Sequence, residues 1–250
     1  MKAITLFGLL VFLHCTALAQ DVGAVIKEGN RLENLPDEKA AFTTFKEVLR
    51  MQPANVYALN KCSELCSRIG KRRPDKASSN DYYQAAVMYA ATALKIDSTN
   101  SESNCVMAIA LGRSSLNKSG KEKIAAASEI KKYVDLSIKN DPHNFKAWHV
   151  LGRWNFELST LNFIERTAAK LIYGAVPAGT LNDAIYAFEK SNSITDGFIL
   201  NYFELARAYQ KNDENRKAIT TLNKMLLLTN QTEDDPMIKE DGRRLLKELQ

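Results

Sequence analysis

The segment from Ala184 to Met225 reads AIYAFEKSNSITDGFILNYFELARAYQKNDENRKAITTLNKM, and its pattern decides the fold. Small and bulky residues recur in it at intervals of three and four, which is the spacing of one face of an α-helix. Three such runs follow one another without a gap: Ala184, Phe188 and Ser191; Tyr202, Leu205, Ala206 and Tyr209; Ala218, Leu222 and Met225. The segment therefore predicts consecutive helices of a repeating array, with small residues where two helices approach closely.

The same register recurs earlier in the chain, and Pro53 and Pro142 close two of the earlier units. The recurrences are Val25, Gly29 and Leu32; Ala41, Phe45 and Val48; Ala86, Ala90 and Ala93; Trp148, Leu151 and Gly152. This arrangement is the tetratricopeptide pattern of paired helices. No stretch alternates with a period of two, so no sheet is expected. The pattern predicts an all-α, tetratricopeptide-like solenoid of about five helix pairs over residues 20–232.

Three units of the predicted solenoid are longer than the repeat requires, near residues 70–80, 119–126 and 160–179. The first insertion is polar and contains a proline, whereas the last has apolar residues near helical spacing. We expect the last one to form an inserted short helix that packs on the solenoid. Residues 233–250 place Ile238, Leu245 and Leu249 on one stripe, which predicts a C-terminal capping helix.

Length and composition narrow the class of protein. The chain has 250 residues, with 34 Lys and Arg against 29 Asp and Glu, a formal net charge of +5. This length is sufficient for a substantial core. Only 11 Gly and 6 Pro are present, which excludes collagen-like and low-complexity classes. So mild a positive charge does not predict a nucleic-acid partner.

The N-terminus has the pattern of a secretory signal. Met1 and Lys2 precede an apolar run from Ala3 to Leu13, and small residues at Ala17 and Ala19 suit a signal peptidase. The run is about half the length that spans a bilayer. We predict a signal peptide over residues 1–19 and an exported, periplasmic or secreted mature chain without a transmembrane helix. An uncleaved N-terminal anchor is the alternative.

Three cysteines, Cys62, Cys66 and Cys105, remain after residue 19. Cys62 and Cys66 are four residues apart on one expected helix, which is poor geometry for a disulfide. A metal site would need more ligands than these cysteines and the histidines His143 and His149 offer. We expect all three cysteines to be small buried residues of the core.

The segment from Asp141 to Ser191 resembles the regulator of microtubule dynamics family. The resemblance rests on a Trp-x-x-Leu-Gly-Arg-Trp helix, here Trp148 to Trp154, followed by an insertion and an Ala/Phe helix. It implies a tetratricopeptide-like helical protein without enzymatic activity. Animal members of the family are described as microtubule-associated proteins or as tethers at organelle membranes. A microtubule-associated role in the cytoplasm, or a membrane-tethering role, is therefore one alternative function for this chain.

Catalytic motifs are absent from the sequence. There is no Gly-x-Ser-x-Gly, no His-Glu-x-x-His and no glycine-rich phosphate loop. His143 follows a proline in an expected turn and is interpreted as a solvated residue. We therefore expect a protein that is not an enzyme and that binds no cofactor or metal.

A concave surface is the expected binding site, because stacked helix pairs line such a surface with their first helices. The repeat register turns these residues inward: Lys146, His149, Arg153 and Phe156 from one helix, and Leu200, Phe203, Arg207 and Gln210 from the next. Arginines bind carboxylates through two parallel hydrogen bonds. The prediction is an extended protein or peptide partner with acidic groups. In the alternative interpretation, Arg153 only pairs with Glu157 or Glu189.

A second candidate site is the run Lys71, Arg72, Arg73 and Lys76. As an exposed basic loop it would contact an anionic surface, either a membrane or a polymer. The alternative interpretation is a solvated loop without a partner.

Overall fold

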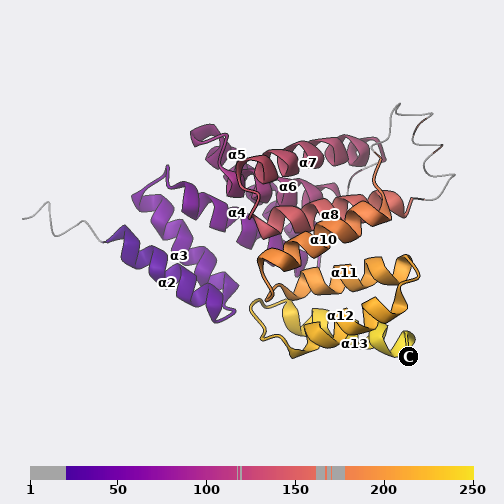
Figure 1. Ribbon diagram of the computed structural model, residues 1–250. Coiled ribbons are helices and arrows are strands. Elements are labelled where there is room, and N and C mark those ends of the chain that lie inside the picture. Colours follow the sequence, from indigo (N-terminus) through magenta and orange to yellow (C-terminus); the bar gives the residue numbers. More distant parts are fainter. Residues whose placement is uncertain (1–20, 117, 119, 162–166, 168–169, 171–177) are drawn as a thin grey trace, which may run out of the picture.

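The computed structural model describes residues 21–161 except 117 and 119, then 167, 170 and 178–250. The predicted signal peptide and most of the 160–179 insertion lie outside the described residues. Everything regular in the described part is helical: α2 (Val22–Asn34), α3 (Glu38–Met51), α4 (Val56–Lys71), α5 (Lys76–Ile96), α6 (Ser101–Ser115), α7 (Gly120–Asn140), α8 (Phe145–Ser159), α10 (Leu181–Ile194), α11 (Ile199–Lys211), α12 (Asn215–Leu227) and α13 (Asp235–Glu248). The predicted all-α fold is confirmed (Figure 1).

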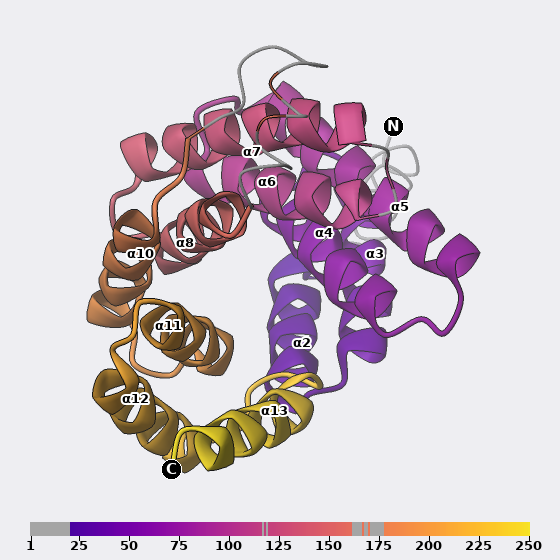
Figure 2. The same cartoon turned by 90° about the vertical axis from the view of Figure 1, so that its right-hand side faces the viewer.

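The described helices form five antiparallel pairs and a final single helix. The pairs are α2 with α3, α4 with α5, α6 with α7, α8 with α10, and α11 with α12. The first helices α8 and α11 lie on the inner side of the curved stack, and α10 and α12 lie outside them (Figure 2). Helix α13 packs on α11 and α12 and buries Ile238 and Leu245.

Glycines on first helices allow aromatic rings of second helices to approach closely. A Cβ atom added at Gly152 would lie 2.5 Å from the ring of Phe188, and one added at Gly29 would lie 2.8 Å from the ring of Phe45. Both phenylalanines are fully buried. The small-residue and aromatic positions of the sequence pattern therefore contact one another across the helix pairs.

Two of the expected insertions lengthen helices instead of loops. Asp75 accepts a hydrogen bond from the backbone N–H of Ser78 and starts α5, so most of the 70–80 segment is helical. Helix α7 begins at Gly120, which places residues 120–126 in its first two turns. Both helices reach 21 residues. Both segments thus belong to helices over most of their length, and α5 starts at Asp75 because an aspartate cap can begin a helix within a polar segment.

The cysteines Cys62, Cys66 and Cys105 are free and fully buried, as the sequence predicted. Burial raises the pKa of the Cys62 and Cys66 thiols to about 12. Cys62 and Cys66 fill the core beside aromatic and aliphatic side chains of α3 to α6.

The two ends of the solenoid meet through polar side chains. Glu233 and Asp234, which precede α13, contact the start of α3 and the end of α4, so that the chain forms an almost closed ring (Figure 2).

Within the part of the chain that the structure describes, no helix is both long and apolar enough to cross a bilayer.

Candidate functional site

The inner helices α8 and α11 bring two arginines to one buried carboxylate. Arg153 of α8 and Arg207 of α11 both pair with Glu204, whose side chain is only 3% exposed. The Arg207 Nη1 atom lies 2.8 Å from Glu204 Oε2. Arg153 also donates to Glu157 over 2.8 Å, and this second pair is solvent-exposed. We call Arg153, Glu157, Glu204 and Arg207 the arginine site.

Both arginine side chains of the arginine site remain partly exposed. The side chains of Arg153 and Arg207 are 38% and 37% exposed. Arg207 also lies over the rings of Phe156 and Phe203, 5.1 and 5.9 Å from their centroids. Stacking and the shared carboxylate fix the orientation of both cations and leave part of each open to a ligand.

A third arginine, Arg113 of α6, lies within electrostatic reach of the arginine site. Its guanidinium has no hydrogen bond or ion pair with any described residue. Burial lowers the pKa of Arg113, and the charge of Arg153 lowers it further, whereas Asp234 and Glu204 oppose the shift. Helix α6 therefore adds a positive charge within electrostatic reach of Arg153 and Glu204, and the sequence did not identify this residue.

His149 belongs to the buried support of the site. It is 7% exposed and packs against the rings of Phe188 and Phe198. Its Nδ1 atom lies 2.9 Å from Asn201 Oδ1. Because Asn201 Nδ2 donates to the carbonyl of Phe188 and to Asn192, Oδ1 is the free acceptor and His149 Nδ1 carries the proton. Burial lowers the pKa of His149 to about 4, so the ring is neutral.

Lys146 is held inside a second buried cluster of charges. Its ammonium lies 2.8 Å from Glu64 and 2.5 Å from Glu102. Burial opposes ionisation of Glu64, but the charges of Lys146, Arg68 and Lys61 hold its pKa well below the usual range. This cluster joins α4, α6 and α8 and leaves Lys146 no free charge for a partner.

The structure thus divides the predicted inward-facing residues into two groups. His149 and Phe156 are buried and Lys146 is ion-paired, so the expectation that these three face a partner is wrong. Arg153, Phe203, Arg207 and Gln210 are only half-buried and remain accessible. The alternative pairing of Arg153 with Glu157 is also present, whereas Glu189 instead accepts from the hydroxyl of Tyr209.

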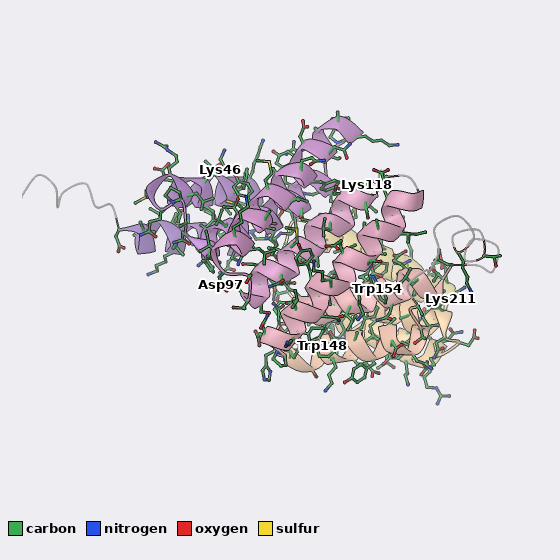
Figure 3. All side chains as sticks on the ribbon, turned by 90° about the horizontal axis from the view of Figure 1, so that it is seen from above. Lys46, Asp97, Lys118, Trp148, Trp154 and Lys211 are labelled. Carbon is green, nitrogen blue, oxygen red and sulfur yellow. The ribbon has the colours of Figure 1, made fainter. Side chains whose placement is uncertain are left out.

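The tryptophans of α8 pack against neighbouring elements (Figure 3). Trp148 donates from Nε1 to the carbonyl of Pro142 over 2.8 Å and meets the ring of Tyr186 edge to face. Trp154 donates to the carbonyl of Ala127 on α7 over 2.7 Å. Both rings therefore position α8.

Two cations of the predicted basic loop, Lys71 and Arg72, form ion pairs at the place where the two ends of the solenoid meet. Lys71 pairs with Asp234 over 3.0 Å, and Arg72 pairs with Asp234 over 3.0 Å, with Glu38 over 2.5 Å and with Glu233 over 3.2 Å. We call these five residues the closure cluster. Lys71 and Arg72 are consequently not available to an anionic surface, and that interpretation is corrected. Lys76 lies in the first turn of α5.

Comparison with known proteins shows the family. The family model described as regulator of microtubule dynamics protein 1-3 matches residues 25–250. The chain belongs to this family. Regulator of microtubule dynamics protein 1 of Caenorhabditis elegans is 28% identical over 127 residues, which cover 51% of this chain and 56% of that protein. The bovine protein 1 is 21% identical over 239 residues, 95% of this chain and 75% of the relative.

The family resemblance and the fold are both confirmed. The segments that match this chain cover about a third to just over half of the length of the first relatives. A thermophilic tetratricopeptide protein of Thermus thermophilus has the same fold, with a TM-score of 0.62 and 13% identity over 91% of this chain and 98% of that one. Family and fold indicate a protein-interaction scaffold more than an enzyme. Among the described residues, no group of His, Cys, Asp and Glu could hold a metal ion.

Proposed function

We propose that this protein is a scaffold that binds an extended, acidic segment of a protein partner on its inner face, at the arginine site. The observation that carries the proposal is the pair of arginines that share one buried carboxylate and still expose more than a third of each side chain. Such guanidinium groups offer parallel N–H donors that match a carboxylate.

The two acidic residues of the arginine site have different roles in this proposal. Glu204 is buried and holds both arginines in place. Glu157 is exposed, and an exposed pair one helical turn apart contributes only about 0.3–0.5 kcal/mol. A partner's carboxylate can therefore replace Glu157 on Arg153 at little cost, while Glu204 keeps the geometry.

Neighbouring side chains extend the surface that a partner would contact. Phe203 and Gln210 lie on the same helix as Arg207, one turn to either side, and are half-buried. Arg113 adds a cation without a described partner. An apolar ring, an amide and two partly exposed arginines, with the charge of Arg113 nearby, suit an acidic segment that also carries apolar residues.

The test uses a variant that keeps the internal charges balanced. Loss of both arginines alone would strand the buried carboxylate of Glu204, which is strongly destabilising. The triple variant Arg153→Gln, Arg207→Gln, Glu204→Gln removes the site without leaving that charge. We expect its affinity for a fluorescent Asp- and Glu-containing peptide, measured by anisotropy, to fall about tenfold or more, since charge-assisted contacts are lost.

A matched control removes the same residue types elsewhere. Arg243 and Arg244 form exposed pairs with Glu240 and Asp241 on α13. The variant Arg243→Gln, Arg244→Gln, Glu240→Gln changes the net charge identically, and we expect it to bind like the wild type. If both triple variants lost the same amount of affinity for the peptide, the loss would follow from net charge alone, and this would contradict the proposal.

A microtubule is the second candidate partner, and membership of the family favours it. The proposal is that the same inner face binds the polymer. Co-sedimentation with polymerised tubulin measures this directly. Binding that the Arg153, Arg207 and Glu204 triple variant abolishes supports it, and no co-sedimentation at micromolar tubulin excludes it.

We further propose that the chain is exported, on the support of the signal pattern in residues 1–19. N-terminal sequencing of the protein purified from its native cells is expected to begin at Gln20. An exported chain does not meet cytosolic microtubules, so a start at Gln20 favours the acidic protein partner, whereas an intact Met1 favours the second candidate.

A further inference from the structure

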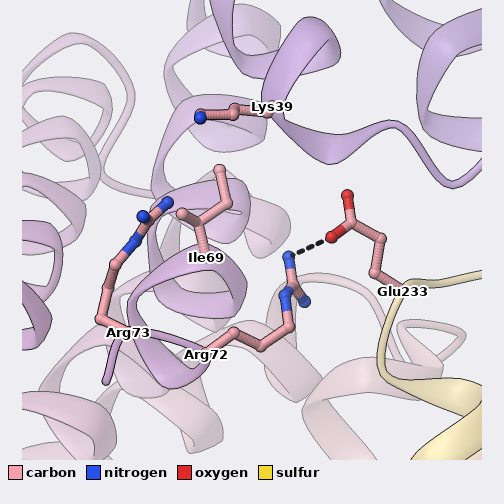
Figure 4. A pocket seen from close by; sticks show the side chains of 5 residues that line it. All are labelled: Lys39, Ile69, Arg72, Arg73 and Glu233. Atoms are coloured by element: carbon pink, nitrogen blue, oxygen red, sulfur yellow. Dashed lines mark ion pairs between the residues drawn. The ribbon is translucent and has the colours of Figure 1, made fainter. Parts of the chain in front are cut away.

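A pocket of about 150 Å³ opens beside the closure cluster. Its walls come from the start of α3, the end of α4 and the segment that precedes α13. It is lined by Lys39, Ile69, Arg72, Arg73 and Glu233. Figure 4 shows the Lys39 ammonium and the Arg73 guanidinium on the left and the Arg72–Glu233 pair on the right. Three lining residues are cations and one is an anion.

Two of these cations have no acidic partner among the residues that the structure describes. The ammonium of Lys39 has no hydrogen bond or ion pair with any described residue. Arg73 lies over the ring of Tyr82, 5.0 Å from its centroid, and its Nε atom is buried without a hydrogen-bond partner in the described part of the chain. A buried donor without an acceptor is unfavourable, so this end of the pocket favours an anionic ligand.

The third cation and the single anion of the pocket offset each other. Arg72 is shared among Glu38, Glu233 and Asp234. Glu233 lies 3.2 Å from Arg72 and also accepts the backbone N–H of Glu38 over 2.9 Å. Glu233 is therefore held by an ion pair and a hydrogen bond within the closure cluster, where Arg68, 3.5 Å from Glu38, adds a further cation. The lining cations that lie outside that cluster are Lys39 and Arg73.

We propose that this pocket binds a small oxyanion of the phosphate type, with Lys39 and Arg73 as its principal contacts and Ile69 as its apolar wall. The Arg73 guanidinium presents parallel N–H donors held in plane by Tyr82, and the Lys39 ammonium adds a point charge from α3. The volume accommodates a tetrahedral anion or a few waters. The pocket is separate from the arginine site and does not depend on the proposed function.

Titration of the full chain with inorganic phosphate, at constant ionic strength maintained with chloride, tests the pocket by calorimetry. We expect saturable binding of one phosphate per chain. The variant Lys39→Gln, Arg73→Gln should weaken it at least tenfold, and Lys39→Gln alone at least threefold. Lys39 is exposed, so the single variant retains its fold even if the loss of Arg73 disturbs the stacking on Tyr82.

The matched control is Lys27→Gln, Lys247→Gln, which removes two exposed cations from α2 and α13. We expect it to bind phosphate as the wild type does. The proposal would be overturned if phosphate did not bind saturably to the wild type. It would also be overturned if the control variant lost as much affinity for phosphate as Lys39→Gln, Arg73→Gln does.

A second arm uses the monoester O-phosphoserine to distinguish the source of the anion. If phosphate alone binds and depends on Lys39 and Arg73, the ligand is a free ion. If the monoester binds with the same dependence, the ligand is the phosphate end of a larger molecule. Either dependence supports the pocket, and a failed titration leaves the proposal for the arginine site untouched.

Discussion

Glu204 determines how the arginine site can work and how it can be tested. A carboxylate that is 3% exposed is stable only because two guanidinium groups neutralise it, since loss of the partners of a buried charge costs about 3–5 kcal/mol. Arg153 and Arg207 consequently stabilise the protein as well as offering a surface. Their removal must be accompanied by neutralisation of Glu204.

Gly152 lies at a close contact between the helices of one pair. A methyl group there would lie 2.5 Å from the fully buried Phe188 ring. We expect Gly152→Ala to lower the free energy of unfolding by about 1–3 kcal/mol, because the ring or the backbone must shift. Urea denaturation followed by circular dichroism measures the change.

Gly112 in α6 is the matched control for this packing. A Cβ atom added there would be 3.8 Å from Ile130, which is an ordinary contact. Alanine is favoured over glycine within a helix, so Gly112→Ala is expected to stabilise the protein by about 0.5–1 kcal/mol. If Gly152→Ala proved as stable as Gly112→Ala, the close packing of α8 on α10 would be contradicted.

His149 should make stability depend on pH. Burial holds its folded pKa near 4, whereas an unfolded histidine titrates near 6.5. The unfolded chain therefore binds more protons between these values, and stability falls as pH decreases from 6.5 to 4, by on the order of 3 kcal/mol. Urea unfolding of the wild type and of His149→Gln, compared from pH 7 to 4, measures this contribution, and parallel pH profiles would rule it out.

At the residue scale the sequence predicted part of the site. The repeat register correctly placed Arg153 and Arg207 on successive first helices. It did not predict the burial of His149 and Phe156 or the role of Glu204, because helical periodicity gives the face of a residue but not the depth at which its side chain packs. Arg207 one turn after Glu204 was the available signal, but an i, i+3 pair is usually a surface pair.

At the element scale the helix pairs were predictable from the sequence. A small residue on one helix of a pair faces a large residue on the other at regular positions, as Gly29 faces Phe45. The lengths of α5 and α7 were not predictable in the same way. Their first turns carry Ser, Asn, Lys and Glu without an apolar stripe, so the helical pattern starts later than the helix does. The cap at Asp75 was the local signal for the true start of α5.

Helix α13 covers the end of the solenoid through one face. Ile238 is 4% exposed in the core cluster, whereas Met237 beside it is 52% exposed. We expect Ile238→Ala to lower the free energy of unfolding by about 2–4 kcal/mol and Met237→Ala to change it by less than about 0.5 kcal/mol. Thermal and urea unfolding compare the two. Similar effects at both positions would show that α13 is not docked through this face.

At the scale of the whole molecule, the ring closure is the feature that the sequence did not predict. Its contacts join residues up to 195 positions apart, and all of them are side-chain or capping interactions of charged residues. Periodicity carries no information about such pairs. The run from Lys71 to Arg73 looked like a free basic loop because the acidic residues that neutralise it lie near the other end of the chain.

The closure should be sensitive to the charges of Glu233 and Asp234. We expect the variant Glu233→Gln, Asp234→Asn to open the ring and to increase the radius of gyration measured by small-angle X-ray scattering, because it removes the acceptors of Lys71 and Arg72. The matched variant Glu240→Gln, Asp241→Asn on the exposed face of α13 should leave the radius unchanged. A change of equal size in the two variants would contradict the closure.

We propose above that an acidic partner segment lies on the inner face at the arginine site. Photo-crosslinking tests it most directly, with benzoylphenylalanine placed at Gln210 on inner helix α11 or at Met88, which is 69% exposed on α5, the second helix of its pair. We expect an acidic peptide to crosslink from position 210 and not from position 88, and its Asn- and Gln-containing counterpart to crosslink from neither. Equal yields from the two positions, or crosslinks from position 88 alone, would contradict it.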